Sequence, residues 1–357
     1  MAFRPACIAF AIFGSACGSQ SNNVANGLPD AAVLADASEA SAQATTDASA
    51  PFVLEKKLYV SFILNVHDWV YGDDSIATLN RVIDLHEKYK VPMDIYLMDP
   101  MVQLYETKAP ELMKRIATSP MVAVSYHLRV PYPYYANFDW MGLASMSDAN
   151  LSSTILNYEE HKLDLASGQA LGASGGYQHL KDVIGYAPYV VVTETGDSRN
   201  ESAMAAIYKQ KGAFFTLVHG RTTELGATKY GLQLRPEHVE VKAYENPSAI
   251  AVDTAIIEPA IAAAPATRPA FINLKWHDDN FHSRKTPWIN VFYVDGDEKS
   301  QPRTPPFDLT AIGDIGLKTE TEKKVQWDRY DAMLAYVVAH PELGTINSRM
   351  LKQALSP

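Results

Sequence analysis

The sequence predicts an α/β fold, a barrel of parallel strands alternating with helices. Short apolar runs typical of buried strands alternate with helical patterns in units of about thirty residues, which is the pattern of a parallel sheet. Five of these runs, 58–66, 121–126, 189–192, 213–218 and 271–275, are closely followed by His67, His127, Glu194, His219 and His277. Because the carboxyl ends of parallel barrel strands open on one face, we expect these side chains to gather at one site.

The N-terminus predicts export. Residues 1–16 carry one early positive charge, Arg4, and a short apolar stretch that ends in small residues, which is a secretory signal in outline. The small residues before Cys17 resemble a bacterial lipobox, so Cys17 is the expected lipidation site and an ordinary signal peptide is the alternative. The apolar stretch is far shorter than the roughly 20 residues that span a bilayer. We therefore expect a lipid-anchored protein of a bacterial cell envelope, or else a secreted one.

Composition sets further limits. Cys7 and Cys17 are the only cysteines, which excludes cysteine catalysis and zinc–thiolate sites from the folded body. Residues 17–51 are rich in Ala, Ser and Asp and contain no Lys or Arg, so they are predicted to be a disordered tether. Residues 52–357 have a length that is ordinary for one α/β barrel. The net charge of −10 argues against nucleic acid as a partner.

The first half of the body gives the clearest elements. After the strand 58–66, a helix is predicted over 74–88, where Ile76, Leu79 and Val82 share one face and Asp74-Ser75 offers a side-chain cap. The elements predicted after it, in chain order, are a strand at 93–98, a helix at 110–117, a strand at 121–126, an aromatic loop at 129–146 and helices at 149–165 and 177–185.

The second half continues the alternation less regularly. Its predicted elements are the strand before Thr193, a helix at 201–211, the strand before His219, an edge hairpin at 232–241, the strand before Trp276, a further strand at 289–294, a proline-rich turn at 301–306 and a final helix at 322–339. The rest of the segment 222–264 has no assigned element.

Three stretches resemble the polysaccharide deacetylase (NodB-homology) family. The first strand with its His-Asp pair, followed by "HEKYKVPMDIYL", is similar to the family's first motif and the segment after it. "VAVSYH" resembles the start of the second motif, and "RYDAMLAYVVAHPELGTINSRMLKQAL" is similar to the closing helix and tail. The sequence departs from the pattern where His67-Asp68 replaces two aspartates and Pro131 replaces a second histidine, and the arginine-bearing third motif has no clear counterpart.

The resemblance implies a distorted (β/α) barrel with about seven parallel strands. It also implies a divalent metal, zinc by preference, and hydrolysis of acetyl groups on a polysaccharide of the cell envelope or the environment. Asp68 and His127 match ligand positions of the family, and His277 or Asp278 could supply a third ligand, with His67 as a rival. His67 or Asp278 would move protons beside Asp68, and Trp69, Arg129, Tyr132 and Trp276 would seat the sugar.

Two other functions stay open at this point. A glycoside hydrolase would use paired carboxylates, with Asp278 or Asp279 and Glu194 as the first pair to test. Alternatively, a barrel that has lost catalysis would only bind glycan at the cell surface. In each case the partners are a glycan and, through the lipid anchor alone, a membrane.

Overall fold

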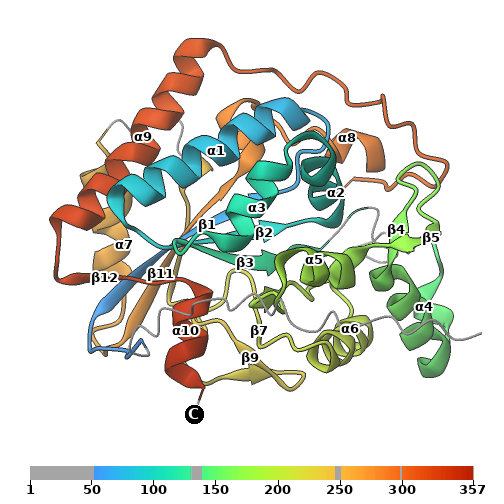
Figure 1. Ribbon diagram of the computed structural model, residues 1–357, viewed down its shortest axis with the longest axis horizontal. Coiled ribbons are helices and arrows are strands. Elements are labelled where there is room, and N and C mark those ends of the chain that lie inside the picture. Colours follow the sequence, from blue (N-terminus) through green and yellow to red (C-terminus); the bar gives the residue numbers. More distant parts are fainter. Residues whose placement is uncertain (1–51, 129, 131–138, 246–250, 298–299, 357) are drawn as a thin grey trace, which may run out of the picture. The chain divides into compact units, whose positions relative to one another are not determined.

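The fold is organised around one mostly parallel sheet. A computed structural model describes residues 52–128, 130, 139–245, 251–297 and 300–356. The strand order of the main sheet is β10-β11-β1-β2-β3-β6-β7-β9-β8, with β12 beside β1 (Figure 1). The strands of this sheet are β1 (Leu58–Val66), β2 (Met93–Leu97), β3 (Val122–Tyr126), β6 (Val190–Val191), β7 (Phe215–Thr216), β8 (Thr228–Lys229), β9 (Leu232–Leu234), β10 (Val239–Lys242), β11 (Ala270–His277) and β12 (Leu343–Thr345).

The centre of the sheet is buried on both faces. All nine residues of β1 are buried, and β1 pairs in parallel with β11 on one side and β2 on the other. Such near-continuous apolar strands are typical of parallel sheets that helices cover on the outside. Because the pairing is parallel, the carboxyl ends of β1, β3 and β11 point the same way, which confirms the arrangement that the sequence predicts.

One bent segment connects the two ends of the curled sheet. β9 pairs in parallel with β7, and β10 pairs in parallel with β11. Only residues 235–238 separate β9 from β10, so the segment 232–242 pairs with β7 at its start and with β11 at its end. This makes the sheet a distorted barrel. The segment is not the edge hairpin that the sequence predicts, since its two halves pair with different strands.

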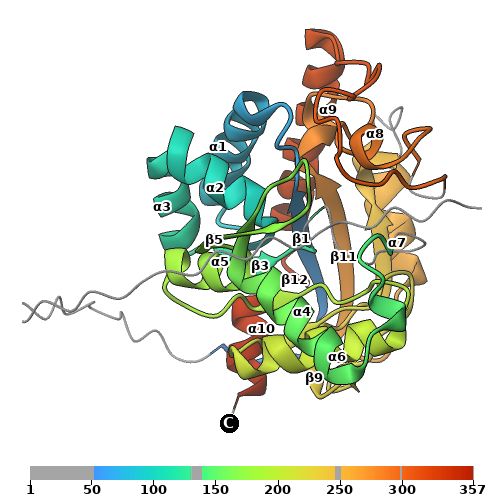
Figure 2. The same cartoon turned by 90° about the vertical axis from the view of Figure 1, so that its right-hand side faces the viewer.

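Helices and a small hairpin surround the sheet. Figure 2 shows α1–α3 and α7 on opposite sides of β1 and β11. The helices are α1 (Gly72–Tyr89), α2 (Asp99–Lys108), α3 (Pro110–Thr118), α4 (Asp148–Glu160), α5 (Gly176–Ile184), α6 (Ser198–Gln210), α7 (Glu258–Ala263), α8 (Ile289–Phe292), α9 (Glu320–Ala339) and α10 (Ser348–Leu355), and the hairpin consists of β4 (His161–Leu163) and β5 (Ala170–Ser174). Short helical turns lie at η1 (Leu143–Ser145), η2 (Ala243–Glu245), η3 (Asp253–Ile257) and η4 (Asp278–Phe281).

Other local predictions are wrong as well. The helix predicted over 149–165 ends at Glu160, and β4 follows it at once. Two further cases show the cause. The run 289–294 forms the short helix α8 and not a strand, and it packs Val291 and Phe292 into a second apolar cluster. Helix α1 begins at Gly72 without a side-chain cap. The Ser75 hydroxyl, expected near the cap, donates instead to Asp278 at 2.5 Å. In both cases a tertiary contact outweighs the local signal.

Within the described residues, we find no helix whose length and apolar character would let it cross a membrane.

Candidate functional site

The five strand-end residues meet at one cavity. His67, His127, Glu194, His219 and His277 all line a hollow of about 490 Å³, together with Trp288 of the segment that follows β11. This confirms that the carboxyl ends of β1, β3, β6, β7 and β11 open on a common face. Cavities of this size are typical of small-molecule sites.

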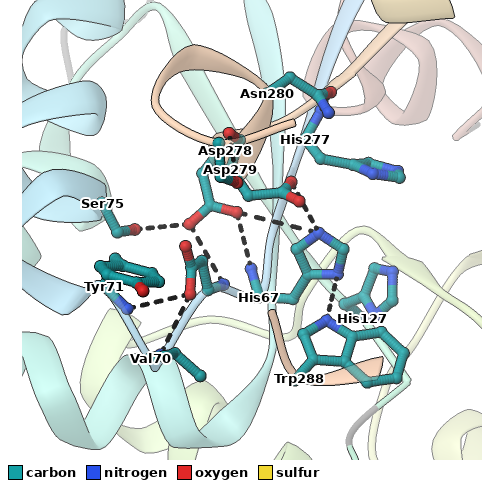
Figure 3. Close-up of polar contacts among 12 residues, drawn as sticks. His67, Val70, Tyr71, Ser75, His127, His277, Asp278, Asp279, Asn280 and Trp288 are labelled. Atoms are coloured by element: carbon teal, nitrogen blue, oxygen red, sulfur yellow. Dashed lines mark hydrogen bonds and ion pairs between the residues drawn. The ribbon is translucent and has the colours of Figure 1, made fainter. Parts of the chain in front are cut away.

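His67 lies at the centre of the polar contacts (Figure 3). Its Nδ1 accepts a hydrogen bond from the indole N–H of Trp288 at 3.2 Å, and its Nε2 lies 3.4 Å from Oδ1 of Asp279. An indole nitrogen can only donate, so Nδ1 holds a lone pair and the neutral ring carries its proton on Nε2. Burial lowers the pKa of His67, but the hydrogen bond with Asp279 and the charges of the nearby carboxylates outweigh it and raise the pKa. The indole N–H of Trp288 at Nδ1 opposes this, because a cationic ring would present a second N–H to that donor.

His67, His277 and Asp279 form a cluster that could hold a metal ion. One ligand atom from each lies within 4.8 Å of the others. Two ligands about 2.1 Å from a tetrahedral zinc ion stand roughly 3.4 Å apart, which is the distance observed between His67 Nε2 and Asp279 Oδ1. The donor set, two imidazoles and a carboxylate, therefore fits a divalent metal such as zinc.

The charges in this cluster also suit a cation. Burial, followed by the charge of His67, lowers the pKa of His277 to about 3, so this ring is neutral near pH 7. Burial raises the pKa of Asp279, but the hydrogen bond and charge of His67 overcome this and hold it well below its usual value. A neutral imidazole and an ionised carboxylate are the protonation states that bind metals.

His127 lines the cavity but lies outside the cluster. Its Nδ1 donates to the carbonyl of Leu128 at 2.7 Å, which leaves the lone pair on Nε2. Burial, followed by the charge of His67, lowers the pKa of His127 to about 3. The ring centroids of His67 and His127 are 5.7 Å apart. His127 is therefore a neutral hydrogen-bond acceptor beside the cluster.

Asp278 supports the site from behind. Its carboxylate accepts the backbone N–H groups of His67 and Asp68 at 3.1 and 3.3 Å and the hydroxyl of Ser75. Burial raises the pKa of Asp278 to about 6. Because Asp278 is fully buried and does not line the cavity, it braces the end of β1, and the structure gives it no direct path to a substrate.

Asp68 also points away from the cluster. Its Oδ1 accepts the backbone N–H groups of Val70 and Tyr71, and its Oδ2 accepts Nε2 of His282 at 2.6 Å. The side chain is fully buried. The structure thus places Asp68 in a turn-stabilising role. Of the predicted ligands, His277 and its rival His67 join the cluster, whereas Asp68 and His127 do not.

Glu194 and His219 line the same cavity and contact each other. Oε2 of Glu194 accepts the backbone N–H of His219 at 2.9 Å. Nδ1 of His219 accepts from Lys275 Nζ at 3.4 Å, so Nε2 of the neutral ring carries the proton and faces Glu194 at 3.7 Å. Burial, then the charge of Lys275, lowers the pKa of His219 to about 4. Burial raises the pKa of Glu194, which favours its protonated form.

The loop after Glu194 is fixed by a second carboxylate. Oε1 of Glu201 accepts the backbone N–H groups of Thr195 and Gly196, while its Oε2 accepts from Lys229 and Tyr230. Glu201 therefore holds Glu194 in place. The sequence does not single out Glu201, Lys275 or Trp288 as functional residues. Only Lys275 leaves a trace in the sequence: it is a lysine inside the largely apolar strand β11, and a buried charge needs partners.

The predicted sugar-binding residues have mixed outcomes. Trp276 is fully buried, with its ring stacked on Phe62 at 6.1 Å and edge-on to Tyr330 at 4.8 Å. Its predicted role is wrong, because it faces the helix layer outside the barrel. Trp69 is half-buried and packs against both apolar clusters. Arg129, Tyr132 and Cys17 lie outside the described residues.

Comparisons with known proteins give distant structural likeness only. No known family profile matches the sequence, and no curated protein matches it. A 4-α-glucanotransferase from Thermococcus litoralis aligns over 85% of this chain and 41% of its own, at 9% identity and a TM-score of 0.49. This chain thus spans less than half the length of that enzyme.

Deacetylase structures are also among the similar folds. The peptidoglycan deacetylase PdaC from Bacillus subtilis aligns over 83% of this chain and 91% of its own, at 11% identity and a TM-score of 0.37. A mutant of a CE4-family pseudoenzyme with restored activity aligns over 85% and 72%, at 10% identity and a TM-score of 0.38. At these values the chemistry of the site has to be inferred from its own residues.

Proposed function

We propose that this protein is a metal-dependent hydrolase that removes acetyl groups from a polysaccharide of the cell envelope or the environment. The observation that carries the proposal is the cluster of His67, His277 and Asp279 at the edge of a cavity that His127 and His219 also line. His67, His277 and Asp279 would hold the metal. A divalent cation at this place supplies polarisation of an acyl carbonyl and a lower pKa for water.

The residues around the cluster have distinct tasks. His127, with its Nε2 lone pair beside the cluster, accepts a hydrogen bond from the attacking water or the substrate. Glu194, which lines the cavity and whose pKa burial raises, would give a proton to the leaving group. His219 and Glu201 keep Glu194 in place.

The geometry argues against a mechanism with paired carboxylates. Such a mechanism needs two carboxylates that both reach the substrate. Asp278 and Asp279 are buried and do not line the cavity, and both oxygens of Glu201 are occupied by other groups. Among the described residues that line the cavity, Glu194 is therefore the one carboxylate that could take part in acid–base chemistry.

The decisive experiment measures metal content and acetate release together. The full chain, incubated with zinc and then desalted, is expected to retain about one zinc per molecule and to release acetate from acetylated chitin oligosaccharides or peptidoglycan fragments. His277→Ala should lose both properties. His340→Ala, the same change at a histidine stacked on Tyr336 at the end of α9, should keep both. A wild-type protein that retains no metal after this treatment would contradict the proposal.

We propose further that the chain is exported and anchored by a lipid on Cys17, with glycan as its substrate. The support is the lipobox-like sequence before Cys17 and the polar segment 17–51. In a bacterial host, Cys17→Ala should move the protein from the membrane fraction to the soluble exported fraction, whereas Cys7→Ala should leave it with the membranes. Equal membrane association of the two variants would contradict a lipid anchor on Cys17.

A further inference from the structure

Trp288 donates a hydrogen bond to His67, and such a donor is an unusual partner for the ring of a proposed metal ligand. Both side chains are buried, at 6% and 3% exposure, and the indole lies edge-on to the imidazole with 5.8 Å between ring centroids. Trp288 belongs to an apolar cluster with Phe292 and Phe307, so its position is fixed by packing as well as by the hydrogen bond.

The direction of this hydrogen bond decides which tautomer of His67 is stable. A histidine that binds a metal through Nε2 normally carries its remaining proton on Nδ1 and donates it to a carboxylate, a carbonyl or water. Here the partner of Nδ1 is an N–H group, which cannot accept a proton. Coordination through Nε2 would move the ring proton to Nδ1, where two donors would face each other.

We propose that Trp288 sets the metal affinity of the cluster by holding His67 in the tautomer that cannot coordinate. A cation held at Nε2 of His67 would cost the hydrogen bond from Trp288 and would leave the buried indole N–H without its acceptor. The inference rests on the proposed metal site. It assigns Trp288 a positioning role, in which this residue acts on the metal through His67.

The size of the effect follows from the cost of an unsatisfied buried donor. Leaving one buried polar group without its partner costs about 1–3 kcal/mol, which corresponds to roughly 5- to 150-fold in a dissociation constant. Removal of the indole N–H should therefore tighten metal binding. Loss of an ordinary supporting partner has the opposite effect and weakens binding.

The test compares zinc affinity in the full chain and two variants, measured by competition with a chelator of known affinity. Trp288→Phe removes the donor and keeps an aromatic ring. Trp140→Phe is the matched control, since Trp140 packs edge-on to Phe307 at 6.4 Å in the same apolar cluster. We expect Trp288→Phe to bind zinc about tenfold more tightly than the wild type, and Trp140→Phe to bind it equally.

A second measurement reports on the hydrogen bond itself. In ¹⁵N-labelled protein the indole N–H resonance of Trp288, assigned from its absence in Trp288→Phe, should shift strongly when zinc is added, and that of Trp140 should shift little. Equal or weaker zinc affinity of Trp288→Phe, or an unmoved Trp288 resonance at full zinc occupancy, would overturn the inference while the metal site stands. Absence of zinc binding in the wild type and in Trp288→Phe would overturn both.

Discussion

His86 shows how burial alone sets the charge of a single side chain in this fold. The ring is fully buried, its Nδ1 donates to the carbonyl of Val91, and its Nε2 accepts from the hydroxyl of Tyr330, each at 2.7 Å. Burial lowers the pKa of His86 to about 4. Both nitrogens are already satisfied by the neutral form, so a second proton has no partner.

A pH dependence of stability follows from His86. In the unfolded chain a histidine titrates near its ordinary pKa of about 6.5. Between that value and the folded pKa of about 4, the unfolded state binds more protons than the folded one. The stabilising contribution is therefore complete above pH 6.5 and is lost as the pH falls towards 4, by up to about 3 kcal/mol.

Urea unfolding at pH 7.5 and pH 5 checks this prediction. The wild type should lose more stability between the two pH values than His86→Gln, which removes the titrating group. The comparison uses the change with pH for each protein, because the substitution also alters the hydrogen bonds at both pH values. Equal pH dependence in the two proteins would show that His86 is not held neutral.

Variants of Asp279 and His127 distinguish between two possible sets of metal ligands. The sequence predicts His127 as a ligand, whereas the structure gathers His67, His277 and Asp279. We expect Asp279→Asn to lose bound metal, because a neutral amide is a poor substitute for an ionised carboxylate. We expect His127→Gln to retain the metal while acetate release falls by about 100-fold. Metal analysis of both purified variants decides between the two assignments.

Glu194 should control the alkaline side of the pH–activity profile. Burial raises its pKa, so the proton that it would give to the leaving group is lost only above the usual titration range of a glutamate. Glu194→Gln is expected to reduce kcat by about 100-fold and to remove that limb of the profile. Glu224→Gln, at an exposed carboxylate paired with His238, should leave the profile unchanged.

At the scale of elements, the bent segment 232–242 depends on one buried arginine. Arg235, between β9 and β10, donates to Asp94 of β2 at 2.8 Å, to Asn273 of β11 at 2.7 Å and to Ser348 of α10 at 3.0 Å. Both members of the Arg235–Asp94 ion pair are buried. One side chain therefore ties the bend to three elements that are distant in sequence.

Breaking this ion pair should destabilise the protein strongly. Arg235→Met leaves the Asp94 carboxylate buried without its charge partner, which costs about 3–5 kcal/mol. The same change at Arg284, whose contact with Glu322 is exposed to solvent, should cost little stability. Chemical unfolding of the two variants beside the wild type measures both values, and similar losses would contradict the structural role of Arg235.

At the scale of the whole molecule, metal binding should report on folding. The proposed ligands come from β1, β11 and η4, which the chain brings together only when the barrel forms. Zinc at about 100 times its dissociation constant should stabilise the wild type by about 2.7 kcal/mol. Thermal unfolding should show a higher Tm with zinc for the wild type and no change for Asp279→Asn. A zinc-dependent Tm in Asp279→Asn would place the metal elsewhere.

The sequence by itself determined the fold class and the face on which the site lies. Buried apolar strands and parallel pairing put His67, His127, Glu194, His219 and His277 at the same ends of neighbouring strands, and the cavity contains all five. Local patterns are enough for this prediction. They show where each strand ends, and in a parallel barrel the carboxyl ends of all strands lie on one face.

Only the tertiary structure decided which side chains act together. Asp68 and Asp279 follow the strands β1 and β11 in similar ways, yet Asp68 turns to His282 and two backbone N–H groups while Asp279 faces His67. Trp276 and Trp288 are both tryptophans near the same strand end, yet one packs into the helix layer and the other donates to His67. The direction of a side chain beyond a strand end depends on partners more than 200 residues away, which local sequence does not encode.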